Sequence, residues 1–347
     1  MRLCASGMEN DFTNKGNIPF IVIDTHCDTP GRLADGAVLS SKGDNGHFDY
    51  PRMAEGGVDC EFFALYTPND MPPDAALRRV MEMSAAVHDS VEAFPGVRMA
   101  YSPSDVMRNK EAGRRSVAVG MENAAPLCKS LPLLREMYRM GVRYVTLTHN
   151  GNNEICDAAL APEKRWNGLS PFGKEFVSEM NRIGMMIDVS HISDDSFFDV
   201  LSCSSAPVIA SHSCCRAISE HPRNMTDGMI KALADAGGVV QINFCPLFVD
   251  ASCDESAYET LPSFKEVADH IEHVIKIAGI GSVGIGSDFD GIDHTPKGLE
   301  DISKMPALLQ ELSGRGYGEK ELALIAGGNF LRVWKTVDDK KTLKIDM

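Results

Sequence analysis

Residues 19–28 read PFIVIDTHCD, and this apolar run leading straight into a polar motif decides the fold. Short, continuous, β-branched runs are typical of strands that are buried on both faces. We therefore predict a strand over Pro19–Ile23, with the polar residues 24–28 at its carboxyl end. The same combination of a strand-like run and a polar residue recurs along the whole chain.

Further runs of this kind follow, separated by helical patterns or loops. They are Cys60–Tyr66, Ser116–Met121, Val142–Thr148, Met185–Val189, Pro207–Ala210, Gly238–Ile242 and Ser282–Gly286. The intervening segments Phe172–Ile183, Met229–Ala236 and Phe264–Ala278 place apolar residues at helical spacing. Strand alternating with helix in this way predicts an α/β fold, the (β/α)8 TIM barrel. A doubly wound open sheet is the alternative.

The composition is that of an ordinary globular protein. Of the 347 residues, 44% are hydrophobic and 24% are charged, which argues against a disordered or fibrous chain. The 34 Lys and Arg residues against 49 Asp and Glu residues give a net charge of −15, which disfavours nucleic acid as a partner. No apolar run reaches the roughly 18 residues that a membrane span needs, so we expect no membrane partner.

Domain organisation and location are inferred from what divides and flanks the motifs. No repeat or Gly/Ser-rich linker divides the chain, so we expect one domain over residues 1–347, with short polar tails at about 1–17 and 338–347. The first residues carry no apolar secretory core, and the final KKTLKIDM carries no lipid-attachment signal, so we expect a cytoplasmic location. The ten cysteines include no CxxC pair and are interpreted as reduced thiols.

Ligand-type side chains follow most of the predicted strands. In a barrel, the carboxyl ends of the strands point to one face, where the loops build the active site. We therefore expect a cluster at that face, formed by Asp24, His26, Asp28, Glu122, His149, His191, His212, Asn243, Asp288 and Asp290.

Five of these residues have the chemistry of a metal site, because imidazole and carboxylate groups suit Zn²⁺. In an extended strand, His26 and Asp28 point the same way and can hold one ion. Glu122 follows the apolar SVAVGM, and bridging two cations roughly 3.5–4 Å apart would offset the cost of burying its charge. His191 and His212 then supply nitrogen ligands to the second ion. The alternatives are hydrogen-bonded structural histidines and, for Glu122, a carboxylate at a helix N-terminus.

Seven motifs in order carry a resemblance that spans nearly the whole chain. They are IDTHCD, GMEN, TLTHN, IDVSH, ASHS, HPRNMTD and GIGSDFDG. With them the sequence resembles the renal or membrane dipeptidase family, zinc dipeptidases of the M19 type within the amidohydrolase-like barrels. The resemblance implies two Zn²⁺ per chain, with His26 and Asp28 on the first ion, His191 and His212 on the second, and Glu122 bridging both.

The resemblance also implies the roles of three residues that act on the substrate. His149 would contact the scissile carbonyl and steady the tetrahedral intermediate. Arg223, in HPRNMTD, would hold the terminal carboxylate of the substrate, and Asp288 would carry a proton from the attacking water to the leaving amine. The residues alone leave two alternatives open, a surface ion pair for Arg223 and a turn residue for Asp288.

The expected function is therefore that of a binuclear zinc dipeptidase, in which a metal-bridging hydroxide cleaves dipeptides. The family implies tolerance for a D-residue at the C-terminal position and a homodimer. An N-acyl-amino-acid deacylase or a cyclic-amide hydrolase on the same scaffold is the main alternative, and a non-catalytic metal-binding protein is another. Cys27 and Cys156 lie beside the predicted site, and we expect them to pack as spectators.

Overall fold

The strands form one parallel sheet that curls into a barrel, in the computed structural model that describes residues 18–43 and 45–343. Neighbouring strands follow the order β1-β2-β4-β5-β6-β7-β8-β9 and pair in parallel. Their bounds are β1 Ile23–Cys27, β2 Cys60–Tyr66, β4 Arg115–Glu122, β5 Val142–Thr146, β6 Met186–Asp188, β7 Ile209–Ser213, β8 Val239–Ile242 and β9 Val283–Ile285. A short strand that the sequence analysis missed, β3 Val97–Met99, pairs with the start of β4.

The first and last strands of the barrel are joined just past their carboxyl ends. Asp28 N donates to Phe289 O at 2.8 Å, and Asp288 N donates to His26 O at 3.0 Å. Lower in the seam, the Thr25 hydroxyl donates to Ile285 O at 3.1 Å. The predicted barrel is therefore confirmed and the doubly wound open sheet is wrong, because an open sheet would leave β1 and β9 apart.

The first predicted strand was placed too early in the chain. We expected Pro19–Ile23, whereas β1 begins at Ile23 and runs through the polar residues to Cys27. Asp24, Thr25 and His26 are all completely buried. Asp24 Oδ1 accepts from Ser287 N at 2.8 Å, so a backbone group across the seam binds one carboxylate oxygen of a residue that looked like part of a loop. The predicted Pro207–Ala210 strand is displaced in the same way, since β7 runs to Ser213.

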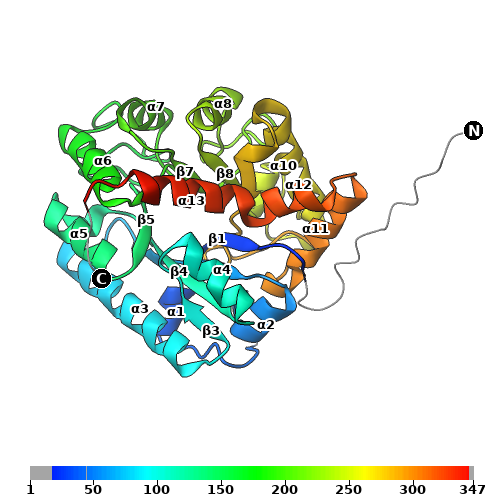
Figure 1. Cartoon of the computed structure of the whole chain (residues 1–347). Helices are drawn as coiled ribbons and strands as arrows, with labels where there is room; N and C mark the ends of the chain where they lie inside the picture. Colours follow the sequence, from blue (N-terminus) through cyan, green and yellow to red (C-terminus); the bar gives the residue numbers. More distant parts are fainter. Residues whose placement is uncertain (1–17, 44, 344–347) are drawn as a thin grey trace, which may run out of the picture.

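Helices cover the outside of the barrel, as Figure 1 shows. The prediction for Phe264–Ala278 coincides with α10, which begins with a capping box between Ser263 and Glu266. The other two predicted helices are α6 Pro171–Ile183 and α8 Asp227–Asp235. The remaining helices are α1 Thr29–Ala34, α2 Tyr50–Glu55, α3 Pro73–Ala93, α4 Pro103–Glu111, α5 Leu131–Arg139, α7 Asp194–Cys203, α9 Pro246–Val249, α11 Met305–Gly314, α12 Glu319–Ala323 and α13 Asn329–Lys340.

Helix α13 lies across the end of the barrel where the strands begin (Figure 1). Its Phe330 and Trp334 rings each lie 5.1 Å from the ring of Phe62, inside the barrel. Residues 338–340, expected in the C-terminal tail, belong to this helix, because Val337 packs with the barrel interior and the helix continues for three more residues. Residues 341–343 of the predicted tail follow the helix, while the predicted tail residues 1–17 and 344–347 lie outside the described residues. With one end closed by α13, the opposite end is left for the site.

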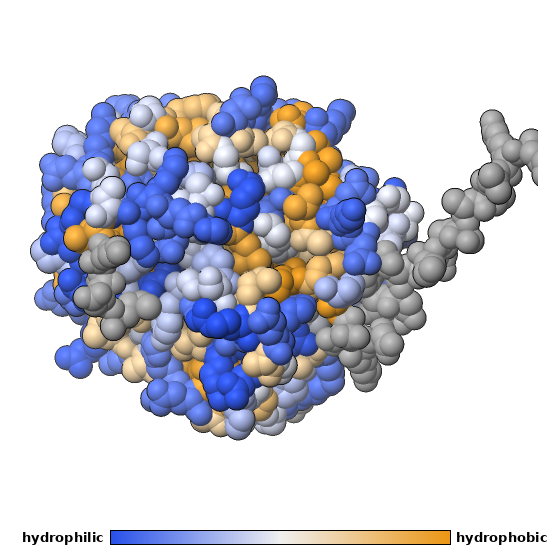
Figure 2. Space-filling view, in the orientation of Figure 1, coloured by the Kyte–Doolittle hydropathy of each residue, from blue (hydrophilic) through white to orange (hydrophobic). Residues whose placement is uncertain are grey.

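Figure 2 shows hydrophilic side chains over much of the face that carries α13, with apolar residues interspersed. Within residues 18–43 and 45–343, no helix combines the length and the apolar character that crossing a membrane requires.

Glu61 in β2 is a buried carboxyl group without a hydrogen-bond partner among the described residues. Burial, together with the charges of Asp24 and Asp290, raises the pKa of Glu61 well above its usual value. Above the ordinary pKa of a glutamate, the unfolded chain has therefore released the proton of Glu61, whereas the folded chain still keeps it. Each further pH unit then lowers the stability of the native protein by about 1.4 kcal/mol, until the folded group also ionises.

We expect Glu61→Gln to have native-like stability at pH 5 and higher stability than the native chain at pH 8. The amide keeps the size of the side chain but removes its titration. Thermal unfolding of both proteins at several pH values measures the difference. Glu111→Gln, an exposed position at the end of α4, is the matched control. An advantage of Glu61→Gln that stays constant from pH 5 to 8 would contradict this account.

Candidate active site

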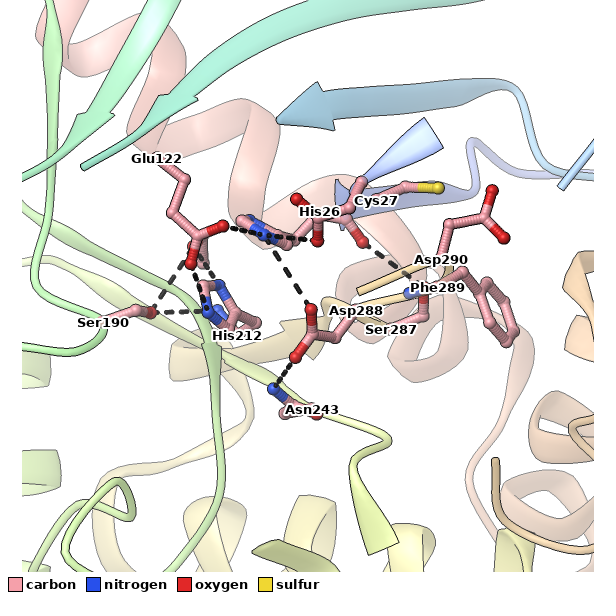
Figure 3. Close-up of polar contacts among 12 residues, drawn as sticks. His26, Cys27, Glu122, Ser190, His212, Asn243, Ser287, Asp288, Phe289 and Asp290 are labelled. Atoms are coloured by element: carbon pink, nitrogen blue, oxygen red, sulfur yellow. Dashed lines mark hydrogen bonds and ion pairs between the residues drawn. The ribbon is translucent and has the colours of Figure 1, made fainter. Parts of the chain in front are cut away.

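The five predicted metal ligands gather at the end of the barrel opposite α13. His26 lies near the end of β1, Glu122 ends β4, and His212 lies in β7. Asp28 caps α1 directly after β1, and His191 follows β6 with a left-handed backbone, φ 70°. Figure 3 shows Glu122, His26 and His212, from three different strands, and Asp288, from the loop after β9, turned toward one another.

Glu122 lies between the two pairs of ligands. Its Oε2 is 3.4 Å from His26 Nε2, which is in turn 3.4 Å from Asp28 Oδ2. Its Oε1 is 2.9 Å from His191 Nε2 and 3.7 Å from His212 Nε2. The structure thus brings together all five residues, with one carboxylate oxygen facing each pair.

The three histidines turn Nε2 toward the cluster because their Nδ1 atoms are already hydrogen-bonded. Such partners fix the ring orientation and the tautomer of a metal-binding histidine. They are Tyr144 Oη at 2.8 Å for His26, Asn150 Oδ1 at 3.0 Å for His191, and Ser211 Oγ at 2.8 Å for His212. Behind Ser211, Asp188 Oδ2 accepts its hydroxyl proton at 2.5 Å.

Two features show that a divalent metal suits this cluster. His26 Nε2 and Asp28 Oδ1 are buried and lack a hydrogen-bond partner among the residues that the structure describes. Asn150 Oδ1 only accepts, so His191 carries its proton on Nδ1 and faces the Glu122 carboxylate with a lone pair. The lone pairs of His191 Nε2 and Glu122 Oε1, 2.9 Å apart, repel each other unless a cation lies between them. Triads of ligand atoms within 4.8 Å of one another are His26–Asp28–Glu122, Glu122–His149–His191 and His26–His212–Asp288.

The pKa shifts of His191, His212 and Asp28 agree with this chemistry. Burial lowers the pKa values of His191 and His212 well below the usual range, so both imidazoles are neutral and available as ligands. Burial and the adjacent charge of Glu122 raise the pKa of Asp28 to about 8. Carboxylates held this close repel one another, and a cation relieves that repulsion.

The residues with predicted roles toward the substrate lie around the same cluster. His149 Nε2 is 4.0 Å from Glu122 Oε1, and Asp288 Oδ1 is 4.0 Å from His26 Nε2. Asn243 Nδ2 donates to the other oxygen of Asp288 at 2.9 Å (Figure 3). Arg223 is 3% exposed, so the alternative of a surface ion pair is wrong. Asp288 does have a turn conformation, φ 68°, but its side chain faces the metal-ligand cluster.

A cavity of about 520 Å³ opens onto these side chains. Besides Asp28, Glu122, His149, His191 and Asp288, its lining includes Tyr66, Leu160, Cys245, Phe248 and Ile292. Arg223 is not among the residues that line this cavity, but it packs behind one of them, since its guanidinium carbon lies 5.2 Å from the centre of the Phe248 ring. Its Nη2 donates to His212 O at 3.2 Å, while its buried Nε has no partner among the described residues.

Sequence reasoning missed most of the cavity wall. Tyr66 ends the predicted strand Cys60–Tyr66, so its position at the barrel mouth could have been inferred. Cys245 precedes the four-residue helix α9, and Phe248 belongs to it. A helix this short shows no hydrophobic periodicity that could reveal it in the sequence. Cys27 and Cys156 are fully buried, and burial raises the pKa of both thiols well above the ordinary value, in agreement with spectator packing.

The model of the membrane dipeptidase family, peptidase family M19, matches residues 17–344. The chain belongs to this family. Dipeptidase verJ of Clonostachys rogersoniana is one of the similar proteins. It is 38% identical over 304 residues, which are 84% of this chain and 76% of the relative.

Solved structures of similar proteins support the same membership. The probable dipeptidase PvdM of Pseudomonas aeruginosa superposes with a TM-score of 0.87 at 26% identity, over 93% of this chain and 96% of that one. A metallo peptidase of Rhodobacter sphaeroides, liganded with a phosphinate mimic of the dipeptide L-Ala-D-Ala, gives 0.84 at 26% identity, over 92% and 99%. The predicted resemblance is confirmed, and the chain is a peptide-bond hydrolase of the dipeptidase type with an amidohydrolase-like barrel.

Proposed function

We propose that this membrane dipeptidase family member is a binuclear zinc enzyme with two Zn²⁺ per chain. His26 and Asp28 would hold the first ion, His191 and His212 the second, and Glu122 would bridge both. The observation that carries the proposal is the position of Glu122, whose two carboxylate oxygens face the two ligand pairs separately. A single ion would leave one of those pairs without a partner.

Zinc bound there would supply Lewis acidity for the scissile carbonyl and lower the pKa of the attacking water. The chain's own residues would supply the rest. Asp288 Oδ2 is held by Asn243, so Oδ1, the oxygen nearer His26, would take the proton of the water and deliver it to the leaving amine. His149 lines the cavity beside Glu122, where its Nε2 would steady charge that develops on the carbonyl oxygen.

The substrate we propose is a dipeptide with a free C-terminal carboxylate. A buried arginine suits such a carboxylate, because a guanidinium forms two parallel hydrogen bonds with it. Arg223 has an unpartnered Nε and lies against the cavity wall. The ligand of the Rhodobacter sphaeroides relative mimics L-Ala-D-Ala, which supports tolerance for a D-residue at the C-terminal position.

One experiment tests both parts of the proposal. Zinc-replete protein is analysed for metal content and assayed with L,L- and L,D-dipeptides, N-acyl amino acids and cyclic amides. We expect two zinc ions per chain and fastest turnover of dipeptides, including L,D-dipeptides. Less than one zinc per chain, with no dipeptide hydrolysis after zinc addition, would overturn the proposal. Faster hydrolysis of N-acyl amino acids or cyclic amides would assign the chain to the alternative functions.

Three further expectations stay predictions. They are the single domain over residues 1–347, the homodimer and the cytoplasmic location. Light scattering of the purified chain measures its oligomeric state, and fractionation of the source cells locates it.

A further inference from the structure

Asp290 lies two residues after Asp288 but turns its carboxylate away from the metal-ligand cluster (Figure 3). Its side chain is 1% exposed. Oδ2 accepts from Thr29 Oγ1 and from Arg32 Nη1, each at 2.6 Å, and Oδ1 accepts from His47 N at 2.6 Å. Both carboxylate oxygens are therefore fully engaged by short hydrogen bonds, one of them from a cation.

These bonds connect segments that are more than 240 residues apart in the chain. Thr29 follows the proposed ligand Asp28 directly, and Arg32 lies one turn further along α1. Asp290 N also donates to His47 Nδ1 at 3.0 Å. The Asp290 side chain thus fastens the start of α1 and the segment around His47 to the loop that carries Asp288.

Gly291 lies between the carboxylates of Asp28 and Asp288, and its missing side chain lets both approach its backbone. A Cβ atom at this glycine would lie 2.2 Å from Asp28 Oδ2 and 2.5 Å from Asp288 Oδ1. Both side chains therefore close over the bare backbone of Gly291. Any movement of the loop at 290–291 would change the spacing between Asp28 and Asp288.

We propose that Asp290 is a positioning residue, which sets the placement of Asp28 and Asp288 without binding metal itself. The inference rests on the proposed function of those two residues. A ligand held in place beforehand binds its ion more tightly, because less conformational freedom is lost on binding. Loosening the Asp290 contacts should therefore weaken the first zinc position, formed by His26 and Asp28, more than the second.

Asp290→Asn is the test variant, because asparagine has the same size and tolerates the left-handed backbone at this position, φ 64°. It removes the charge that faces Arg32 and one acceptor site. The matched control is Asp59→Asn at the opposite end of the barrel. Asp59 is equally buried, accepts from Val22 N at 3.0 Å, and contacts Lys110 Nζ at 2.6 Å.

Three measurements on the full chain separate positioning from general stability. They are zinc affinity by competition with a chelator, the absorption spectrum of the Co²⁺-substituted protein, and kcat with KM. For Asp290→Asn we expect one of the two zinc ions, the one that we assign to His26 and Asp28, to lose about 10- to 100-fold in affinity. We also expect an altered Co²⁺ spectrum and a lower kcat with little change in KM. Asp59→Asn should lower Tm but keep the native zinc affinity and Co²⁺ spectrum.

Native zinc affinity and a native Co²⁺ spectrum in Asp290→Asn would overturn the inference, as would equal losses of zinc affinity in both variants. If Asp290→Asn does not fold, Thr29→Val removes one of the same hydrogen bonds and should shift zinc affinity in the same direction by less. Failure of the proposed function is distinguishable, because the native chain itself would then not bind two zinc ions.

Discussion

Replacing Asp288 by asparagine is expected to lower kcat by about 10²- to 10⁴-fold while the zinc content stays native. The amide cannot accept the proton of the attacking water or deliver it to the leaving amine. The bond to Asn243 can survive, because the new side chain can turn its carbonyl oxygen toward Asn243 Nδ2. Asparagine also tolerates the left-handed backbone at this position, φ 68°.

The measurement is steady-state kinetics with an L,L-dipeptide, together with metal analysis of the same preparation. Asp293→Asn removes an equal charge from an exposed position in the same loop and should leave kcat unchanged. Asp288 also belongs to a triad of possible ligands with His26 and His212. Loss of zinc in Asp288→Asn would therefore make Asp288 a ligand and contradict the proton-transfer assignment.

Arg223→Met is expected to lower kcat/KM for dipeptides by about 10²- to 10³-fold, mainly through KM. The loss corresponds to about 3–4 kcal/mol, as expected when one partner of a buried, charge-assisted pair is removed. Dipeptide amides lack the terminal carboxylate, so their already slow hydrolysis should change little. Methionine keeps the length and much of the volume of the side chain, which preserves its packing against Phe248.

Arg332→Met is the charge-matched control for Arg223. Arg332 is exposed in α13, and its guanidinium donates to the carbonyl oxygens of Gly237 and Gly281, each at 2.8 Å. Its replacement should leave kcat/KM near the native value. Because Arg223 also donates to His212 O, zinc content is measured in parallel. Equal losses for dipeptides and their amides would show that Arg223 supports His212 rather than the substrate carboxylate.

Much of the proposed site could be predicted because each candidate ligand follows an apolar, β-branched run. His26, Glu122, His191 and His212 lie at or just past the ends of buried strands, and parallel strands must bring such ends to one face. The limits of β1 could not be predicted in this way. Asp24 and Thr25 look like loop residues until Ser287 and Ile285, more than 250 residues away, provide their hydrogen-bond partners.

The sequence by itself determined the barrel, the five candidate metal ligands and the family, because these depend on local patterns and their order along the chain. Only the tertiary structure showed how the surroundings of Asp288, to which the resemblance gives a role, differ from those of Asp290 in the same SDFDG motif. Asp288 faces His26, whereas Asp290 is bound by Thr29, Arg32 and His47. These four residues lie at the other end of the chain, and they become neighbours of the motif only when closure of the barrel joins β1 to β9.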